Sequence, residues 1–282
     1  MSNFHYFHPA DNVAPNATVT TGGVADSAYP LVNLTDFSYA NLANPAKLTG
    51  VTGDFILDFG AAQRVDGVML WHNADAALAY AIQHNATNSW AGPTVNFATT
   101  APAKRADLRT IKNYKDLRAV SGYSAGGFRY LRVNYSGTNS VPLGLKIMAF
   151  SGIRQTLRNF RWGWRRDETQ TGIRMTTDAR VPWHYDLGAS GRVLEFEVPG
   201  KDADYAAIAA WVQAAGGSAK PIGMVPDPAV NDFLLGNFTS SGGAIVAPTL
   251  DVYRLEAPYD YLQLNPLRFV IDEITAGDPE WY

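Results

Sequence analysis

The 282-residue sequence contains no cysteine, which excludes disulfides, thiolate metal sites and cysteine nucleophiles together. Charged residues make up only 17% and the formal net charge is −3, so the sequence has no basic footprint for nucleic acid. No apolar run approaches the roughly 18 residues of a membrane span. The opening residues, MSNFHYFHPADN, lack the basic and apolar regions of a signal peptide, so we expect none.

Turn formers and aromatic residues are plentiful instead. The chain has 25 glycines, 16 prolines and 12% aromatic residues, a composition typical of a turn-rich, mainly β protein. Its length is enough for two ordinary domains, and its 46% hydrophobic content is enough for well-buried cores.

Two alternating segments in the first half predict a pair of sandwich strands. In GDFILDFGAAQRVDGVMLWHN (53–73), Phe55, Leu57 and Phe59 recur at every second position before a polar break, and a second alternating run ends at Trp71. We expect Phe59 and Trp71 to point into the core. The same pattern predicts further strands in residues 79–90, 127–137 and 143–152.

The last of these strands, LGLKIMAFSG, alternates Leu145 and Ile147 with Lys146 and Met148. Such alternation predicts one face in the core and one face toward solvent. After Gly152 the composition changes, and we place a domain boundary there, giving domains 1–152 and 153–282. The second domain has one clear helix, DADYAAIAAWVQAAGG (202–217), and several strands, so the predicted class is mainly β with an α+β second domain.

The first half resembles the galactose-binding-like family, also called discoidin or coagulation-factor type C domains. GDFILDFGAAQRVDGVML is similar to the family's strand–turn–strand signature, AYAIQHNATNSW to its tyrosine strand leading to a tryptophan, and GGFRYLRVNYSG to its closing strand. The resemblance implies a jelly-roll sandwich. The version with YPLVNLTD upstream and LWHNA downstream looks most like the copy in bacteriophage tail proteins.

The second half resembles β-rich domains of phage baseplate and distal tail proteins. The resemblance rests on a helix ending in Trp-x-x-x-Ala-Gly-Gly, followed by KPIGMVPDP, LLGNF and a C-terminal FVIDEI strand. It implies assembly with other tail proteins.

Three motifs suggest catalysis, but each lacks its partners. Asp58-Phe59-Gly60 has no kinase glycine-rich loop, strand lysine or His-Arg-Asp loop beside it. Ser124, in Gly-Tyr-Ser-Ala-Gly, precedes a strand, whereas a nucleophile elbow needs a helix there. Glu195 and Glu197 lie two apart on one strand, whereas glycosidase carboxylates flank the substrate. We therefore expect no enzyme activity.

The sequence predicts no metal site and no cofactor. The histidines are scattered and no His-Glu-x-x-His motif is present. The galactose-binding-like resemblance implies a calcium ion near Asp26 or Asp36, but aspartates in loops are usually turn formers, and we expect no bound metal.

RNFRWGWRR (158–166) mixes arginines and aromatic residues, and three interpretations stay open. The composition suits a platform for single-stranded nucleic acid, but the acidic chain argues against that function. Strict alternation also fits a strand with arginines outward. In a tail protein these arginines can pair with acidic groups of a neighbouring subunit, which makes a candidate interface of Arg158, Arg161, Arg165 and Arg166.

Two functions compete. The first is a structural virion protein of a phage tail tip or baseplate, of distal tail type, which links tube to hub and forms a ring with copies of itself. Such a protein assembles in the host cytoplasm. The alternative is a host-recognition module that binds a surface glycan through its loops. Candidate glycan-binding residues, chosen as aromatic platforms and hydrogen-bonding groups, are Tyr39, Asn41, His72, Asn73, Asn88 and Trp90.

Overall fold

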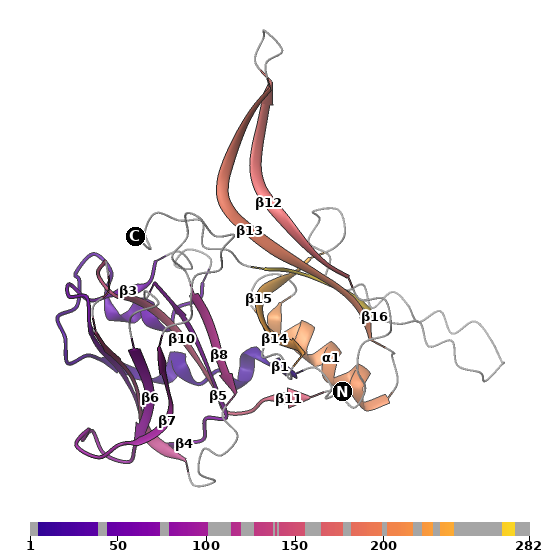
Figure 1. The fold of residues 1–282 in the computed structure, drawn as a ribbon. Coiled ribbons are helices and arrows are strands. Elements are labelled where there is room, and N and C mark those ends of the chain that lie inside the picture. The colour runs from indigo at the N-terminus through magenta and orange to yellow at the C-terminus, as the bar shows by residue number, and fades with distance from the viewer. Residues whose placement is uncertain are drawn as a thin grey trace. The chain divides into compact units, whose positions relative to one another are not determined.

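The computed structural model describes residues 5–38, 44–73, 79–100, 114–119, 127–137, 139, 141–155, 165–176, 182–198, 202–216, 222–227, 232–239 and 267–273. In several of the strands, only the backbone is described. The chain divides into two units (Figure 1). The first consists mainly of residues 11–153, and the second combines residues 1–10 with 154–186 and 190–275.

The first unit is a sandwich of two antiparallel sheets, which confirms the predicted mainly β class and jelly-roll architecture. One sheet has five strands in the order β2 (Thr18–Thr20), β4 (Gly53–Gln63), β9 (Phe128–Ser136), β6 (Ala79–Asn85) and β7 (Thr94–Thr100). The other has four, in the order β3 (Ala46–Lys47), β10 (Gly144–Phe150), β5 (Gly67–His72) and β8 (Tyr114–Ala119). The described residues of this unit also form the short 3-10 helices η2 (Ala14–Asn16) and η3 (Leu31–Leu34), and η1 (Pro9–Asp11) lies where the chain enters the unit.

The core of this unit lies between the two sheets. Phe55 and Leu57 of β4 belong to it, as their alternation predicts, and Phe59 is partly buried against it. The side chain of Trp71 lies outside the described residues. Other members come from both sheets: Val68, Leu70, Tyr80, Ile82, Phe128, Leu131, Val133, Tyr135, Leu145, Ile147 and Ala149.

Strand β10 departs from the expected alternation because both of its faces are covered. Leu145 and Ile147 join the core, but Lys146 and Met148 on the opposite face are buried as well. Met69, which pairs with Met148 in register, is also buried. The prediction of a solvent-facing side for this strand was therefore wrong, and the near-continuous apolar run of β10 reflects burial on both faces.

The second unit is built on a seven-stranded antiparallel sheet. Its order is β11 (Arg154–Gln155), β1 (His5–Phe7), β14 (Ile222–Asp227), β15 (Asp232–Thr239), β16 (Leu267–Glu273), β13 (Pro182–Val198) and β12 (Arg165–Thr176). The predicted helix is α1 (Asp202–Ala215), which ends where Gly216 adopts a φ of 61°. No described helix is long and apolar enough to cross a membrane.

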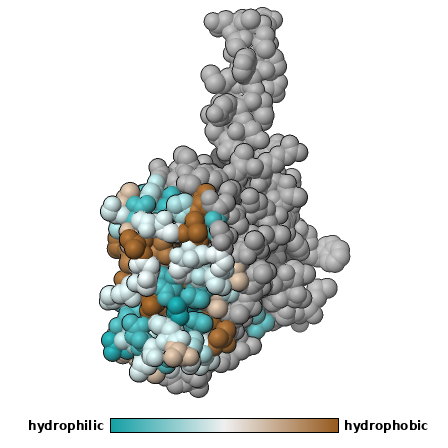
Figure 2. Space-filling view, turned by 60° about the vertical axis from the view of Figure 1, so that its left-hand side comes forward, coloured by the Kyte–Doolittle hydropathy of each residue, from teal (hydrophilic) through white to brown (hydrophobic). Residues whose placement is uncertain are grey.

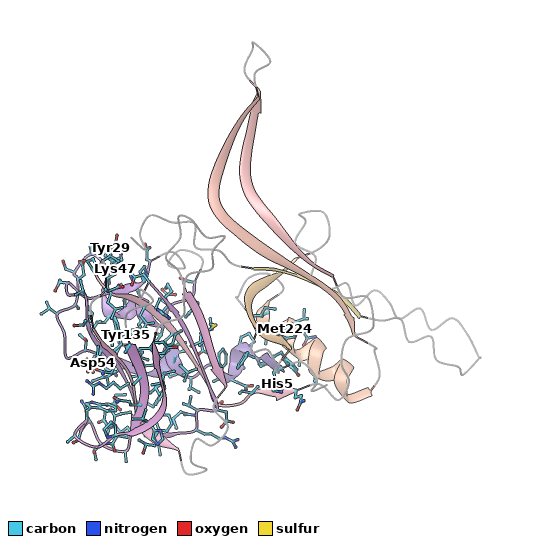
Figure 3. All side chains as sticks on the ribbon, in the orientation of Figure 1. His5, Tyr29, Lys47, Asp54, Tyr135 and Met224 are labelled. Carbon is cyan, nitrogen blue, oxygen red and sulfur yellow. The ribbon has the colours of Figure 1, made fainter. Side chains whose placement is uncertain are left out.

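The N-terminal strand β1 belongs to the second unit, although the sequence analysis placed it in domain 1–152. Tyr6 pairs with Arg154 of β11 on one side and Met224 of β14 on the other (Figure 3 labels His5 and Met224 in these neighbouring strands). Tyr6 and Phe7 are buried, and the indole nitrogen of Trp211 in α1 donates a 3.0 Å hydrogen bond to the Phe7 carbonyl. The long-range pairing that holds β1 has no signal in the local sequence.

Candidate functional site

Among the described residues, the face of the five-stranded sheet that points away from the core carries a connected set of polar side chains. Along β4, Phe55 and Leu57 enter the core, so Asp54 and Asp58 lie on the opposite side of the strand. Together with side chains from β6 and β9 they form a surface that we call the polar face: Asp54, Asp58, Gln83, Arg129, Arg132 and Asn134. Figure 2 turns the left side of Figure 1 forward and shows hydrophilic residues gathered between smaller hydrophobic groups.

An ion pair between Arg132 and Asp54 is the centre of the polar face. Arg132 Nε lies 2.7 Å from Asp54 Oδ2, and the two side chains are only 19% and 8% exposed. The other carboxylate oxygen, Oδ1, accepts a hydrogen bond of 2.6 Å from the Gly22 backbone nitrogen. The pair joins β9 to β4, and its low exposure means that removal of either partner leaves the other charge poorly solvated.

Arg132 also contacts three other side chains. Its Nη2 donates to Asn134 Oδ1 at 2.9 Å and its Nη1 donates to Gln83 Oε1 at 3.4 Å. The guanidinium carbon lies 5.2 Å from the centre of the Trp90 ring, within the range of a cation–π contact. Trp90 is partly exposed, and its indole nitrogen donates to Asn88 Oδ1 at 2.8 Å.

A second ion pair involves Asp58, four residues further along β4. Arg129 donates to both oxygens of Asp58, at 2.7 and 2.9 Å, and the Gly60 nitrogen donates to Oδ1 at 2.8 Å. The hydrogen bond from Arg129 is the main cause that lowers the pKa of Asp58 to about 2. Phe59 lies between these residues, and its ring packs 6.3 Å from that of Phe128. Asp58-Phe59-Gly60 thus has structural contacts throughout.

Of the six predicted glycan-binding residues, the structure places Asn88 and Trp90 side by side next to the polar face. Tyr39 and Asn41 lie outside the described residues. His72 and Asn73 are fully buried, so they cannot form a glycan-binding surface as predicted. The sequence analysis chose them as hydrogen-bonding groups in a loop, but their side chains turn inward.

The inward contacts of His72 and Asn73 explain their burial. The His72 ring packs 5.6 Å from Tyr80 and 5.9 Å from Tyr135, and burial lowers its pKa to about 3. Asn73 donates through Nδ2 to the Pro142 carbonyl at 2.9 Å and accepts from the Gly144 nitrogen at 2.8 Å. Its amide therefore replaces backbone partners where β5 ends.

The four arginines of the predicted interface are only partly described. Arg165 and Arg166 lie at the start of β12, opposite Glu195 and Leu194 of β13, and only their backbones are described. Arg158 and Arg161 lie outside the described residues, as does Ser124. The interface therefore stays a prediction.

Lys146, which the sequence analysis expected on an exposed face, is fully buried. Its ammonium group donates to the backbone carbonyls of Asn33 at 3.0 Å and Asp36 at 2.5 Å, and it lies 5.3 Å from the centre of the Phe37 ring. Burial lowers the pKa of Lys146 to about 8, and the charge of Asp36 opposes this shift. Lys146 thus connects η3 and the residues that follow it to strand β10.

Neither aspartate of the calcium hypothesis shows a cluster of ligands around it. Oδ1 of Asp26 accepts from the Ala28 nitrogen at 2.9 Å, and Oδ1 of Asp36 accepts from the Ser38 nitrogen at 2.8 Å, which are turn contacts. The described residues contain no group of three or more metal-ligating side chains. Near Asp26, the Lys47 ammonium lies 3.9 Å from the centre of the Tyr29 ring (Figure 3), a second buried lysine that the sequence did not reveal.

Comparison with solved structures finds similar sandwiches. Chitosan-binding module 1 of a chitosanase/glucanase from Paenibacillus sp. IK-5 is 20% identical, covering 49% of this chain and 98% of its own, with a TM-score of 0.38. A module produced by Clostridium perfringens, solved with GlcNAc-α-1,4-galactose, is 14% identical over 50% of this chain and 93% of its own, with a TM-score of 0.37. The lectin domain of lectinolysin, solved with Lewis B antigen, is 13% identical over 50% and 96%, with a TM-score of 0.35.

Each of these structures covers about half of this chain. No family model matches the sequence, and no curated protein matches it.

Proposed function

We propose that the protein binds carbohydrate through the polar face and the adjoining Trp90. The observation that supports this proposal is the partly exposed Trp90 ring, set against Arg132 and next to the side-chain amides of Gln83, Asn88 and Asn134. Sugars are held by an aromatic surface against their C–H groups and by fixed polar groups around their oxygens. Both kinds of group are present here, on two strands and the turn that follows one of them.

The structural neighbours include a chitosan-binding module and a lectin domain. Their likeness to this chain is one of fold, and function resides in the site rather than the fold. The proposal therefore depends on the side chains of this chain. We further propose that the protein acts by binding without turnover, because Asp54 and Asp58 are each engaged by an arginine and neither is placed as a free acid or base.

Replacing Trp90 with alanine tests this proposal. We expect full-length Trp90→Ala to lose at least about tenfold in affinity for its glycan, because an aromatic anchor at a binding site typically contributes more than 1 kcal/mol. A glycan array would identify the ligand, and titration calorimetry would measure the loss. Val32→Thr, which alters a side chain 67% exposed outside this face, is the control. Equal affinities of Trp90→Ala and the parent chain would refute a site at Trp90.

A second proposal concerns the second unit. We propose that it assembles with copies of itself, as a structural ring component of a phage tail tip or baseplate that contacts the tail tube and hub. The supporting observation is the hairpin of β12 and β13. Strand β13 pairs with β16 from Val193 onward. On the other side of Val193, β13 pairs with β12, from the pair of Gly191 with Thr169 to the pair of Pro182 with Thr176. This stretch is a two-stranded ribbon among the described strands (Figure 1), and unpaired strand edges are sites of association.

Shortening the ribbon tests assembly. Gln170 and Ser190 pair in register, so an Asn-Gly turn can join them and replace residues 171–189. We expect the parent chain to sediment as an oligomer and the shortened chain as a monomer. The second unit should be folded in both proteins. A parent chain that remains monomeric at tens of micromolar would refute this role and, with it, the proposed place in the virion.

A further inference from the structure

Three carboxamides, two in the polar face and one next to it, share one property: each oxygen faces a group that can only donate. Asn134 Oδ1 and Gln83 Oε1 both accept from the Arg132 guanidinium. Asn88 Oδ1 accepts from the Trp90 indole nitrogen. Guanidinium and indole nitrogens have no acceptor capacity, so an amide placed against them must present its oxygen.

This rule fixes the direction of all three amides. The oxygen and nitrogen of a side-chain amide are hard to distinguish by shape, but a donor-only partner removes the ambiguity. The amino groups of Gln83, Asn88 and Asn134 must therefore point away from Arg132 and Trp90. Among the contacts of the described residues, none engages these three amino groups, and Asn88 is exposed.

The carboxylates of the polar face already accept hydrogen bonds from groups of the protein. Asp54 accepts from Arg132 and from the Gly22 nitrogen, and Asp58 accepts from Arg129 and the Gly60 nitrogen. Each aspartate also neutralises one arginine, so the two pairs carry no net charge. The surface thus offers hydrogen-bond donors around an aromatic ring, without a free carboxylate and without excess charge.

We propose that this surface binds an uncharged acceptor, the acetamido group of an N-acetylated sugar. The proposal depends on the glycan-binding function above and specifies its ligand. The acetamido carbonyl accepts from the amino groups of Asn134, Gln83 or Asn88, and its methyl group packs against Trp90. A deacetylated amino sugar brings an ammonium group, which would require free acceptors. A uronic acid brings a charge, which the two neutral ion pairs do not balance.

Isosteric substitutions separate this ligand role from a structural one. Asn134→Asp and Asn88→Asp keep an oxygen against Arg132 and Trp90, but they remove the amino group. In a purely structural role, the Asn134→Asp carboxylate would hold Arg132 at least as well as the amide does. Asn16→Asp is the matched control, because Asn16 is exposed in η2 and is not one of the residues of the polar face, and the change in charge is the same.

The experiment is titration calorimetry of the full-length chain with three oligosaccharides of equal length: N-acetylglucosamine, glucosamine and glucuronic acid oligomers. We expect the N-acetylated oligomer to bind at least about tenfold more tightly than the other two. We expect Asn134→Asp to lose about tenfold of that affinity with an unchanged melting temperature, and Asn16→Asp to lose none.

The outcomes distinguish this inference from the proposed function. Glycan binding that depends on Trp90 but survives Asn134→Asp and Asn88→Asp would overturn the acetamido assignment and leave glycan binding in place. Preference for the glucosamine or glucuronic acid oligomer would do the same. A chain that binds no saccharide on an array would refute the proposed function, and this inference with it.

Discussion

Trp211→Ala is expected to destabilise the second unit by about 3–5 kcal/mol, the usual cost of deleting a buried aromatic side chain. Trp211 is fully buried in α1, and its ring lies 4.6 Å from that of Tyr6 in β1. Its indole nitrogen also donates a hydrogen bond to the Phe7 carbonyl. The substitution therefore removes both the apolar contact and the hydrogen bond that fasten the N-terminal strand to the helix.

Urea unfolding followed by separate probes for the two units would measure this loss, since two-state analysis of the whole chain is not justified for a protein of two units. Gln213→Ala, at an exposed position of the same helix, is the control. Trp211→Phe keeps most of the ring and loses the hydrogen bond, so we expect an intermediate effect. If the second unit of Trp211→Ala unfolded at the same urea concentration as that of the parent chain, the contact of β1 with α1 would not stabilise the second unit.

The stability of the first unit is expected to rise by about 3 kcal/mol between pH 8 and pH 10.5 through Lys146 alone. Its pKa is about 8 in the folded protein, below the ordinary value of 10.5. Below pH 8 the amine is charged in both states, and the cost of burying that charge is fully present. Between the two pKa values the unfolded chain binds more protons than the folded chain, so the free energy of unfolding increases with pH.

Comparison with Lys146→Met isolates this effect from other groups that titrate in the same range. The parent chain should gain stability relative to Lys146→Met as the pH rises from 8 to 10.5, whatever their difference at neutral pH. Asp36→Asn should move the gain to lower pH, because the charge of Asp36 raises the pKa of Lys146. Parallel pH profiles for the parent and Lys146→Met would contradict the buried, shifted lysine.

The sequence predicted the first sandwich well because its strands alternate in the local pattern. Phe55 and Leu57 enter the core as expected, and the glycine after α1 ends the helix where the pattern indicated. Local pattern also drew attention to Trp90 and Asn88, which meet next to Arg132. It did not identify Arg132, because the sequence around a strand arginine does not predict which side chains of the neighbouring strands contact it.

The errors arose where distant segments decide the environment. The sequence predicts His72 and Asn73 in a glycan-binding loop, but Tyr80, Tyr135 and residues 142–144 enclose them. The alternation in β10 predicts that Lys146 faces solvent, but residues 33–37 cover it. The boundary at residue 152 missed β1 because its partners, β11 and β14, lie about 150 and 220 residues further along the chain.

The pairing of β1 with β11 bears on how the domain composition of such a chain can change in evolution. His5 lies opposite Gln155 and Tyr6 opposite Arg154, so the chain leaves the seven-stranded sheet and returns to it at adjacent points. Beyond these strands, the Ser151 nitrogen donates to the Asp11 carbonyl, and Asn12 bridges to Phe150. The sandwich is thus an insertion in a hairpin of the second unit. An insertion whose ends meet can be exchanged for another module, or lost, while the host sheet keeps its register.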